Sequence, residues 1–209
     1  MLGEALTSSF ANSLAPEALT VVADRPWAEI ARVANTYRCA SLLVGMEALS
    51  DESVESRLED LMSTVDTDIV VLRAPPGWRL SNVRRVLVPV RGRHDQSLSR
   101  ARLLGGLKRV RDLEVVFLQV LPEGAPEPDT TKMTRELSML AGDEVPFHCE
   151  TRIAHNDDVA TEVAAQAADC DLVILGIQRL GRRRKVLGKM ARAVAQDTDC
   201  GLIMLSSRG

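Results

Sequence analysis

The chain has 209 residues, of which 45% are hydrophobic, 26% charged and 3% aromatic, and its formal net charge is −3. These values are typical of a soluble globular protein with one large or two small domains. No run approaches the roughly 18–20 apolar residues of a transmembrane helix, and the N-terminus lacks the segments of a signal peptide. We therefore expect a cytosolic chain, and its acidic balance argues against nucleic acid as a partner.

The beginning of the chain predicts two helices and a strand. Residues 3–14 are a candidate helix, and residues 18–23 are a candidate strand. Asp24 can cap a helix over 27–38, because its carboxylate can accept backbone N–H groups. Pro26 suits the first turn of that helix, where no N–H partner is lost.

A strand, a helix and a strand follow. Residues 39–45 are largely apolar, Ser50 or Asp51 can cap the next helix, and residues 69–72 form a short apolar strand. The helix between these strands carries one apolar face at helical spacing. That face consists of Val54, Leu58, Leu61, Met62 and Val65.

Proline and glycine interrupt the pattern at 74–78, where the sequence is Ala-Pro-Pro-Gly-Trp. Such a segment is typical of a linker, and it divides the chain into domains 1–76 and 77–209. The second domain then reads without interruption. Its predicted elements are strand 86–90, helix 96–109, strand 114–120, a loop at 122–128, helix 131–141, strand 147–153, helix 159–168, strand 172–175, a helix with its apolar face over 187–198, and strand 202–205.

Five strands alternating with four helices predict an α/β fold with a parallel sheet. Strands 86–90 and 172–175 are continuously apolar, as in the centre of a sheet, whereas 147–153 alternates with polar residues, as at an edge. A doubly wound sheet of order 3-2-1-4-5 satisfies both observations. Its ligand crevice lies where residues 91–93 and 176–188 follow the first and fourth strands.

An internal repeat relates the two domains. The sequence from Cys39 to Gly45 reappears from Cys170 to Gly176, 131 positions later, and the next helices match at an offset of 133. The first domain is therefore predicted to be a partial copy of the same fold, equivalent to strands three to five. The second copy has a loop about two residues longer after Gly176.

The four cysteines lack CxxC spacing, so neither a zinc site nor a disulfide framework is expected. They are Cys39, Cys149, Cys170 and Cys200. Free thiols in a reducing compartment are the expected state.

The second domain resembles a universal stress protein domain. The residues that carry the resemblance are Val86-Leu87-Val88-Pro89-Val90, the helix at 97–105, the strand at 115–120 and Asp171-Leu172-Val173-Ile174-Leu175-Gly176. The likeness covers 85–206 as a full domain, and 24–73 resembles the last part of another. It implies the same α/β fold, tandem or dimeric assembly, and in many members an ATP site.

That resemblance implies a glycine-rich loop after the fourth strand, of the form G-x2-G-x9-G-[ST]. Gly176 matches its first glycine, Arg179 replaces the second, and Gly188 matches the third one residue early. Lys189 replaces the hydroxyl side chain, and Arg91 replaces an acidic residue after the first strand. Side chains at these positions obstruct the approach of a phosphate to backbone N–H groups. No cofactor is therefore expected, and Gly176, Gly188, Lys189 and Arg91 remain weak candidates for binding ATP or another anion.

The first domain retains less of this loop. Gly45 is present, but Ala48 stands at the second position and Glu55-Ser56 at the third pair. Acidic residues at the start of the helix would repel phosphate, although they suit the helix dipole.

A basic run surrounds the loop of the second domain. It could contact an anionic ligand or acidic lipid headgroups, or it could be a solvated surface; nucleic acid fits least, because no aromatic residues accompany it. Its members are Arg179, Arg182, Arg183, Arg184, Lys185, Lys189 and Arg192.

No set of residues predicts catalysis. The histidines are His94, His148 and His155, and none has a nucleophile and an acid at a spacing typical of a triad. The segment His155-Asn156-Asp157-Asp158 could suggest a metal site, but Asn156 or Asp157 as a helix cap explains it better. We expect neither an enzyme nor a metal.

An incomplete first domain leaves strands that must close up or find a partner. A degenerate tandem of this kind resembles the cytosolic C-terminal region of amino-acid permease and cation-chloride cotransporter-like transporters. That resemblance implies a non-enzymatic regulatory or assembly domain at the cytosolic face of a membrane, with the parent's membrane domain as a partner. The alternative is a free-standing tandem universal stress protein that binds a nucleotide in the second domain. A homodimer is expected in both cases, because the apolar strands 69–72 and 202–205 can pair across a pseudo-twofold axis.

Overall fold

The computed structural model describes residues 19–49, 52–91, 97–110, 112–180 and 184–207. The candidate helix at 3–14 lies outside these ranges. The elements are α2 (Pro26–Thr36), β1 (Ser41–Met46), α3 (Glu52–Thr64), β2 (Asp68–Arg73), η1 (Leu80–Asn82), β3 (Arg85–Pro89), α4 (Ser97–Val110), β4 (Glu114–Leu121), α5 (Glu127–Glu144), β5 (Glu150–His155), α6 (Val159–Ala167), β6 (Leu172–Gly176), β7 (Gln178–Leu180), β8 (Arg184–Val186), α7 (Lys189–Asp197) and β9 (Gly201–Ser206).

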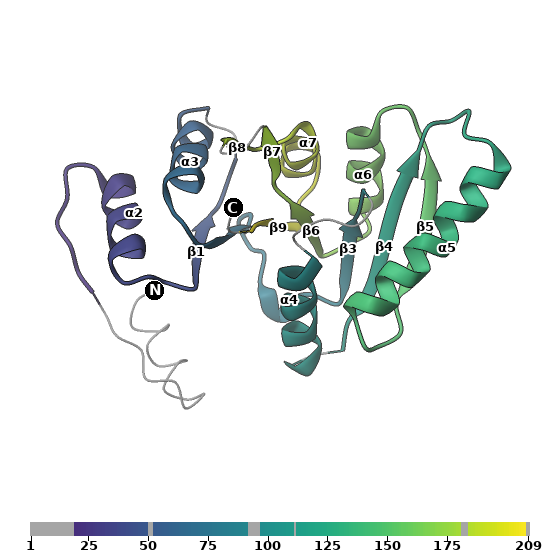
Figure 1. Cartoon of the computed structure of the whole chain (residues 1–209), viewed down its shortest axis with the longest axis horizontal. Coiled ribbons are helices and arrows are strands. Elements are labelled where there is room, and N and C mark those ends of the chain that lie inside the picture. The colour runs from purple at the N-terminus through teal and green to yellow at the C-terminus, as the bar shows by residue number, and fades with distance from the viewer. Residues whose placement is uncertain (1–18, 50–51, 92–96, 111, 181–183, 208–209) are drawn as a thin grey trace.

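Seven strands form one sheet in the order β1-β2-β9-β6-β3-β4-β5, and a small hairpin, β7-β8, stands apart (Figure 1). The strands of the second half follow the predicted order 3-2-1-4-5, because β5, β4, β3, β6 and β9 lie side by side and run parallel. The predicted α/β doubly wound sheet is therefore confirmed. β3 and β6 lie inside the sheet and β5 lies at its edge, as their patterns of apolar residues indicated.

The last strands of the two halves pair with each other within the chain. β2 runs antiparallel to β9, with Val70 opposite Leu205 and Leu72 opposite Ile203. Strands 69–72 and 202–205 thus pair with each other as expected, but they do so within one chain, so their pairing is no longer a reason to expect a homodimer. The pairing joins both halves in one sheet, so the apolar core continues across the linker.

Helices cover the sheet on both faces. On one face α2, α3, α6 and α7 bury a cluster that includes Leu58, Met62, Val163 and Val194. On the other face α4 and α5 bury a second cluster around Phe117. Within the described ranges, no helix combines the length and the apolar character needed to cross a membrane.

Three predicted elements differ from the structure. Residues 19–23 are not a strand. The equivalent strand of the second half, β5, pairs with β4. The described part of the first half contains no equivalent of β4, so these residues have no strand to pair with. Helix α5 begins at Glu127, inside the predicted loop 122–128, because proline is tolerated in the first turn of a helix. β5 begins at Glu150, not at residue 147.

The linker is anchored by Trp78. Its Nε1 donates to the carbonyl of Asp171 at 2.8 Å, and its ring lies over Gly201 at the start of β9. A Cβ atom on Gly201 would lie 2.4 Å from the Trp78 ring. Because that distance is far inside van der Waals contact, the close approach requires glycine.

We expect Gly201→Ala to lower the free energy of unfolding by about 1–3 kcal/mol, because the indole must move out of a packed site. Urea titration followed by tryptophan fluorescence measures this loss. Gly142→Ala in α5 is the matched control, since a Cβ there meets nothing within 4 Å. Alanine should stabilise that helix slightly. Equal effects of the two substitutions would contradict the role assigned to Trp78.

Candidate functional site

The predicted crevice lies at the carboxyl ends of β3 and β6. These strands are direct neighbours, with Val86 opposite Leu172 and Leu87 opposite Val173. Gly176 is the last residue of β6, and Arg91 is exposed shortly after β3. Neighbouring strands whose connections leave on opposite faces create such a crevice in doubly wound sheets.

The segment after Gly176 is an antiparallel hairpin and not the predicted loop. Gln178 lies opposite Val186, and Leu180 lies opposite Arg184. The sequence of this hairpin is rich in charged residues and lacks the apolar pattern that predicts a strand. Such a sequence can form strands here because β7 and β8 pair with each other and not with the main sheet. Of the basic run, Arg179, Arg184 and Lys185 belong to this hairpin; Arg182 and Arg183 lie outside the described residues.

Gly188 and Lys189 stand at the start of α7. Gly188 is the N-cap residue, and the ammonium of Lys189 contacts Oδ2 of Asp158 at 2.7 Å. The hydrogen bond from Lys189 is the largest cause that lowers the pKa of Asp158, followed by the backbone N–H of Thr161. Lys189, which the sequence suggested as a phosphate ligand, is therefore paired with the carboxylate of Asp158.

Two carboxylates from α3 also reach this loop. Oε1 of Glu59 accepts the backbone N–H of Leu187 at 3.0 Å, and Oε2 of Glu55 contacts Arg192 at 2.8 Å. The side chain of Glu55 is 9% exposed and that of Arg192 is 51% exposed, so the carboxylate is buried while the guanidinium stays open to water. Anions bind at helix N-termini through such N–H groups and cations. Glu59 holds the N–H of the residue before the cap of α7, and Glu55 pairs with a cation one turn into that helix.

The predicted site residues are thus only partly brought together. Gly188 and Lys189 are adjacent at the helix start, and Gly176 lies at the other end of the hairpin. Arg91 follows a neighbouring strand. Sequence analysis missed Glu55 and Glu59 as partners of this loop, since it treated Glu55 only as an acidic residue of the first domain and did not single out Glu59.

The segment 155–158 is a helix start, as expected, but the cap is Asp158 and not Asn156 or Asp157. Oδ1 of Asp158 accepts the N–H groups of Ala160 and Thr161, and Asn156 accepts the N–H of Asp158 at 2.8 Å. Across the residues that the structure describes, no group of three or more histidine, cysteine and acidic side chains could hold a metal ion.

Burial makes Cys149, Cys170 and Cys200 poor nucleophiles. It raises the pKa of Cys170 to about 11 and is also the largest cause that raises the pKa values of Cys149 and Cys200. A thiol with a raised pKa is protonated at neutral pH, whereas the thiolate is the reactive form.

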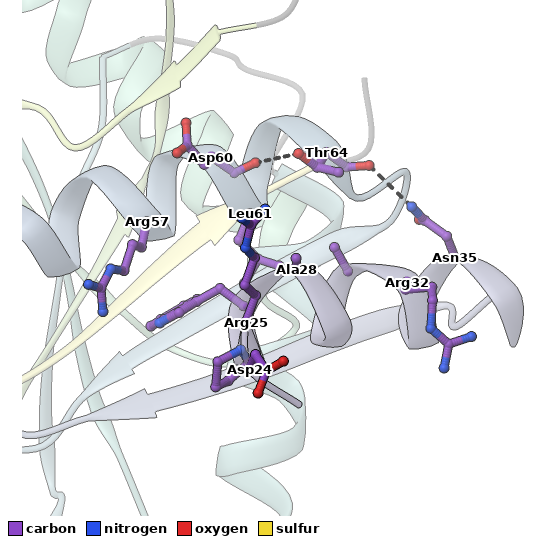
Figure 2. A pocket seen from close by; sticks show the side chains of 12 residues that line it. Asp24, Arg25, Ala28, Arg32, Asn35, Arg57, Asp60, Leu61 and Thr64 are labelled. Atoms are coloured by element: carbon purple, nitrogen blue, oxygen red, sulfur yellow. Dashed lines mark hydrogen bonds between the residues drawn. The ribbon is translucent and has the colours of Figure 1, made fainter. Parts of the chain in front are cut away.

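A cavity of about 610 Å³ lies elsewhere, between α2 and α3 (Figure 2). In Figure 2, Asn35 on α2 reaches Thr64 at the end of α3, and its Nδ2 donates to that carbonyl at 3.2 Å. The lining residues are Asp24, Arg25, Pro26, Trp27, Ala28, Ala31, Arg32, Asn35, Arg57, Asp60, Leu61 and Thr64.

The lining of this cavity is mixed. Trp27 is half-buried and packs against the core. Arg32 is paired with Glu29 on its own helix at 2.5 Å. The corresponding helices of the second half, α6 and α7, contact each other more extensively than α2 and α3 do. The cavity therefore reflects the looser packing of the first half.

Comparison with known proteins identifies the fold. No protein family model matches the chain, and no curated protein matches it either. Among solved structures, the cytoplasmic domain of a prokaryotic cation chloride cotransporter is 10% identical, with a TM-score of 0.66 over 97% of this chain and 77% of that one.

Two further structures share the fold. A universal stress protein from Archaeoglobus fulgidus is 14% identical, with a TM-score of 0.60 over 100% of this chain and 75% of that one. A protein of unknown function from Pseudomonas aeruginosa PAO1 is 15% identical, with a TM-score of 0.62 over 99% of this chain and 77% of that one. The chain has the universal stress protein fold, which a cotransporter's cytoplasmic domain shares, as the resemblance implied.

Proposed function

We propose that this chain is a non-enzymatic regulatory or assembly domain of a membrane transporter of the amino-acid permease and cation-chloride cotransporter type. The observation that carries the proposal is the likeness to a cotransporter's cytoplasmic domain along 97% of the chain. A fold alone does not assign a function. The state of the crevice adds a second argument.

The crevice supports a role in assembly because internal contacts engage several of its ligand groups. Lys189 is paired with Asp158, the N–H of Leu187 with Glu59, and Arg192 with Glu55. The last two contacts join α3 to the hairpin and to α7. The contacts of Glu59 with Leu187 and of Glu55 with Arg192 therefore hold the two halves together beside the crevice.

In this proposal, 1–76 is a partial copy of the fold and 77–209 a complete one. The domain acts through its surfaces at the cytosolic face of the membrane, and its partners are the membrane domain of the parent transporter and a second copy of itself. The proposal assigns the domain no catalytic step.

The genomic locus tests the transporter assignment. We expect the transcript that contains Met1 to encode transmembrane helices upstream, in the same reading frame or in an adjacent gene. Membrane fractionation of cells that carry an epitope on this chain provides a second measurement, and the chain should sediment with the membranes. A transcript without a transporter gene, together with a chain found only in the supernatant, would exclude the proposal.

The alternative is nucleotide binding in the second domain. Two observations favour it. Gly188 caps α7 without a side chain, and Arg91 lies exposed after β3, the strand beside β6. A phosphate at that helix start would have to displace Glu59 from Leu187 or bind beside it.

Thermal unfolding with ATP distinguishes the two functions. A ligand present at 100 times its dissociation constant stabilises the folded state by about 2.7 kcal/mol. We expect no shift of the melting temperature at millimolar ATP, because Arg179 replaces a glycine of the phosphate loop and Lys189 is paired with Asp158. Glu59→Gln serves as a matched variant that removes the competing charge and keeps the shape. A saturable shift in the wild-type chain that Arg91→Ala abolishes would support the alternative instead.

A further inference from the structure

Within the part of the chain that the structure describes, the strand β1 has one open edge. It lies at the end of the sheet and pairs with β2, and no other described strand contacts it. β6 occupies the same place in the second half, beside β9, but its other edge is covered by β3. Figure 1 shows β1 next to α3 at the margin of the sheet.

The hydrogen-bonding groups on this edge can be assigned from one contact. The carbonyl of Met46 accepts the N–H of Ala74 after β2, at 2.8 Å. Backbone groups of successive residues in a strand point to opposite edges. Leu42, Val44 and Met46 therefore bond to β2. The N–H and C=O groups of Ser41, Leu43 and Gly45 point to the open edge.

Nothing in β1 protects this edge from another strand. Its sequence, Ser-Leu-Leu-Val-Gly-Met, contains no charge and no proline, which are the usual means of blocking an edge. Leu43 is 67% exposed on the sheet face opposite α2 and α3. An uncharged edge strand with an exposed apolar side chain is a template for pairing.

We propose that β1 pairs with β1 of a second copy of this chain, antiparallel and across a twofold axis that passes Leu43. In this register Leu43 lies opposite Leu43, and Ser41 lies opposite Gly45. All outward-pointing residues then form hydrogen-bonded pairs with each other. A register centred on Leu42 or Val44 leaves one of them beyond the end of the partner strand. The two Leu43 side chains cover each other on the same face.

Charge complementarity selects this partner and this direction. Arg38 is exposed in the turn before β1, and Glu47 is exposed directly after it. An antiparallel partner brings the arginine end of one strand to the glutamate end of the other, and the twofold axis repeats this arrangement. A parallel arrangement would place Arg38 against Arg38 and Glu47 against Glu47. The occupant that fits this edge is therefore a second copy of the chain.

Sedimentation velocity of the purified chain tests the pairing. We expect a concentration-dependent dimer, and Leu43→Lys should raise its dissociation constant at least about tenfold, which is ~1.4 kcal/mol. Met139→Lys on α5 is the matched control, because Met139 is 57% exposed and lies far along the sheet order from β1. It should leave the dimer unchanged. Both variants should keep the melting temperature of the isolated subunit.

Cross-linking tests the register. Hydrogen-bonded pairs in antiparallel strands have Cα atoms about 5.5 Å apart, which is within the range of a disulfide. Leu43→Cys should form a covalent dimer on oxidation, whereas Met139→Cys should not. A wild-type chain that remains monomeric at millimolar concentration overturns the proposal. So does a dimer that Leu43→Lys leaves intact. Either result leaves the transporter assignment standing, because that assignment is tested by the locus and by membrane fractionation.

Discussion

Replacement of Arg73 by leucine is expected to lower the free energy of unfolding by about 3–5 kcal/mol, because several charge-assisted hydrogen bonds are lost at one buried site. Arg73 ends β2, and only 7% of the residue is exposed. Its Nη1 donates to the carbonyls of Thr198 at 3.1 Å and Cys200 at 2.7 Å, and its Nη2 donates to Ala195 at 2.7 Å. Urea titration measures the loss.

The position of these carbonyls explains the size of the effect. Ala195 lies in the last turn of α7, where carbonyls lack partners within the helix. A cation there also interacts favourably with the negative end of the helix dipole. Arg73 of the first half thus caps a helix of the second half. Folded domains are stable by only about 5–15 kcal/mol, so this loss is a large share of the total.

Two further variants isolate the cause. Arg73→Lys keeps the charge but not the planar fork, so it should recover only part of the loss. Arg79→Leu removes an exposed arginine and should change stability by less than about 0.5 kcal/mol. If Arg73→Leu matched Arg79→Leu, the hydrogen bonds from Arg73 would carry no stability, and the halves would be joined by β2 and β9 and by the contacts of α3 with the hairpin and α7.

Arg100→Ala is expected to cost about 3–5 kcal/mol, because it leaves the carboxylate of Glu144 buried without a partner. Arg100 lies on α4 and Glu144 at the end of α5, and their side chains are 4% and 5% exposed. Nε of Arg100 donates to Oε2 of Glu144 at 2.7 Å, and Nη2 donates to Oε1. The pair braces the two helices that cover one face of the sheet.

The double substitution Arg100→Met with Glu144→Leu provides the control. Replacing both charges by apolar side chains of similar size removes the uncompensated carboxylate, and buried pairs treated in this way often lose little stability. We therefore expect the double variant to be more stable than Arg100→Ala. A double variant as unstable as the single one would show that packing of the arginine stem, not the charge of Glu144, determines the loss.

Much of the fold could be predicted because local patterns and the core agree. The continuous apolar runs of β3 and β6 indicated central strands, and the alternation before Ile153 indicated an edge. The segment 19–23 has the composition of a strand but is not one. A strand requires a hydrogen-bonding neighbour, and composition does not supply it.

The candidate site was less predictable. Its glycines and basic residues could be read from the loop after β6, but the partners of that loop are distant in sequence. Glu59 and Leu187 are 128 positions apart, and Asp158 and Lys189 are 31 apart. Such contacts depend on where α3 and α6 are placed by the sheet, which no local spacing reveals.

Side-chain periodicity predicted the strands of the main sheet and the helices between them, because it reports which faces are buried. It did not reveal that β2 and β9 join within one chain, that carboxylates of α3 contact the segment beside the crevice, or that one edge of β1 is open among the described residues. These features arise from contacts between segments far apart along the chain. Their energies come from burial and pairing in three dimensions, and the local sequence carries no record of the partner.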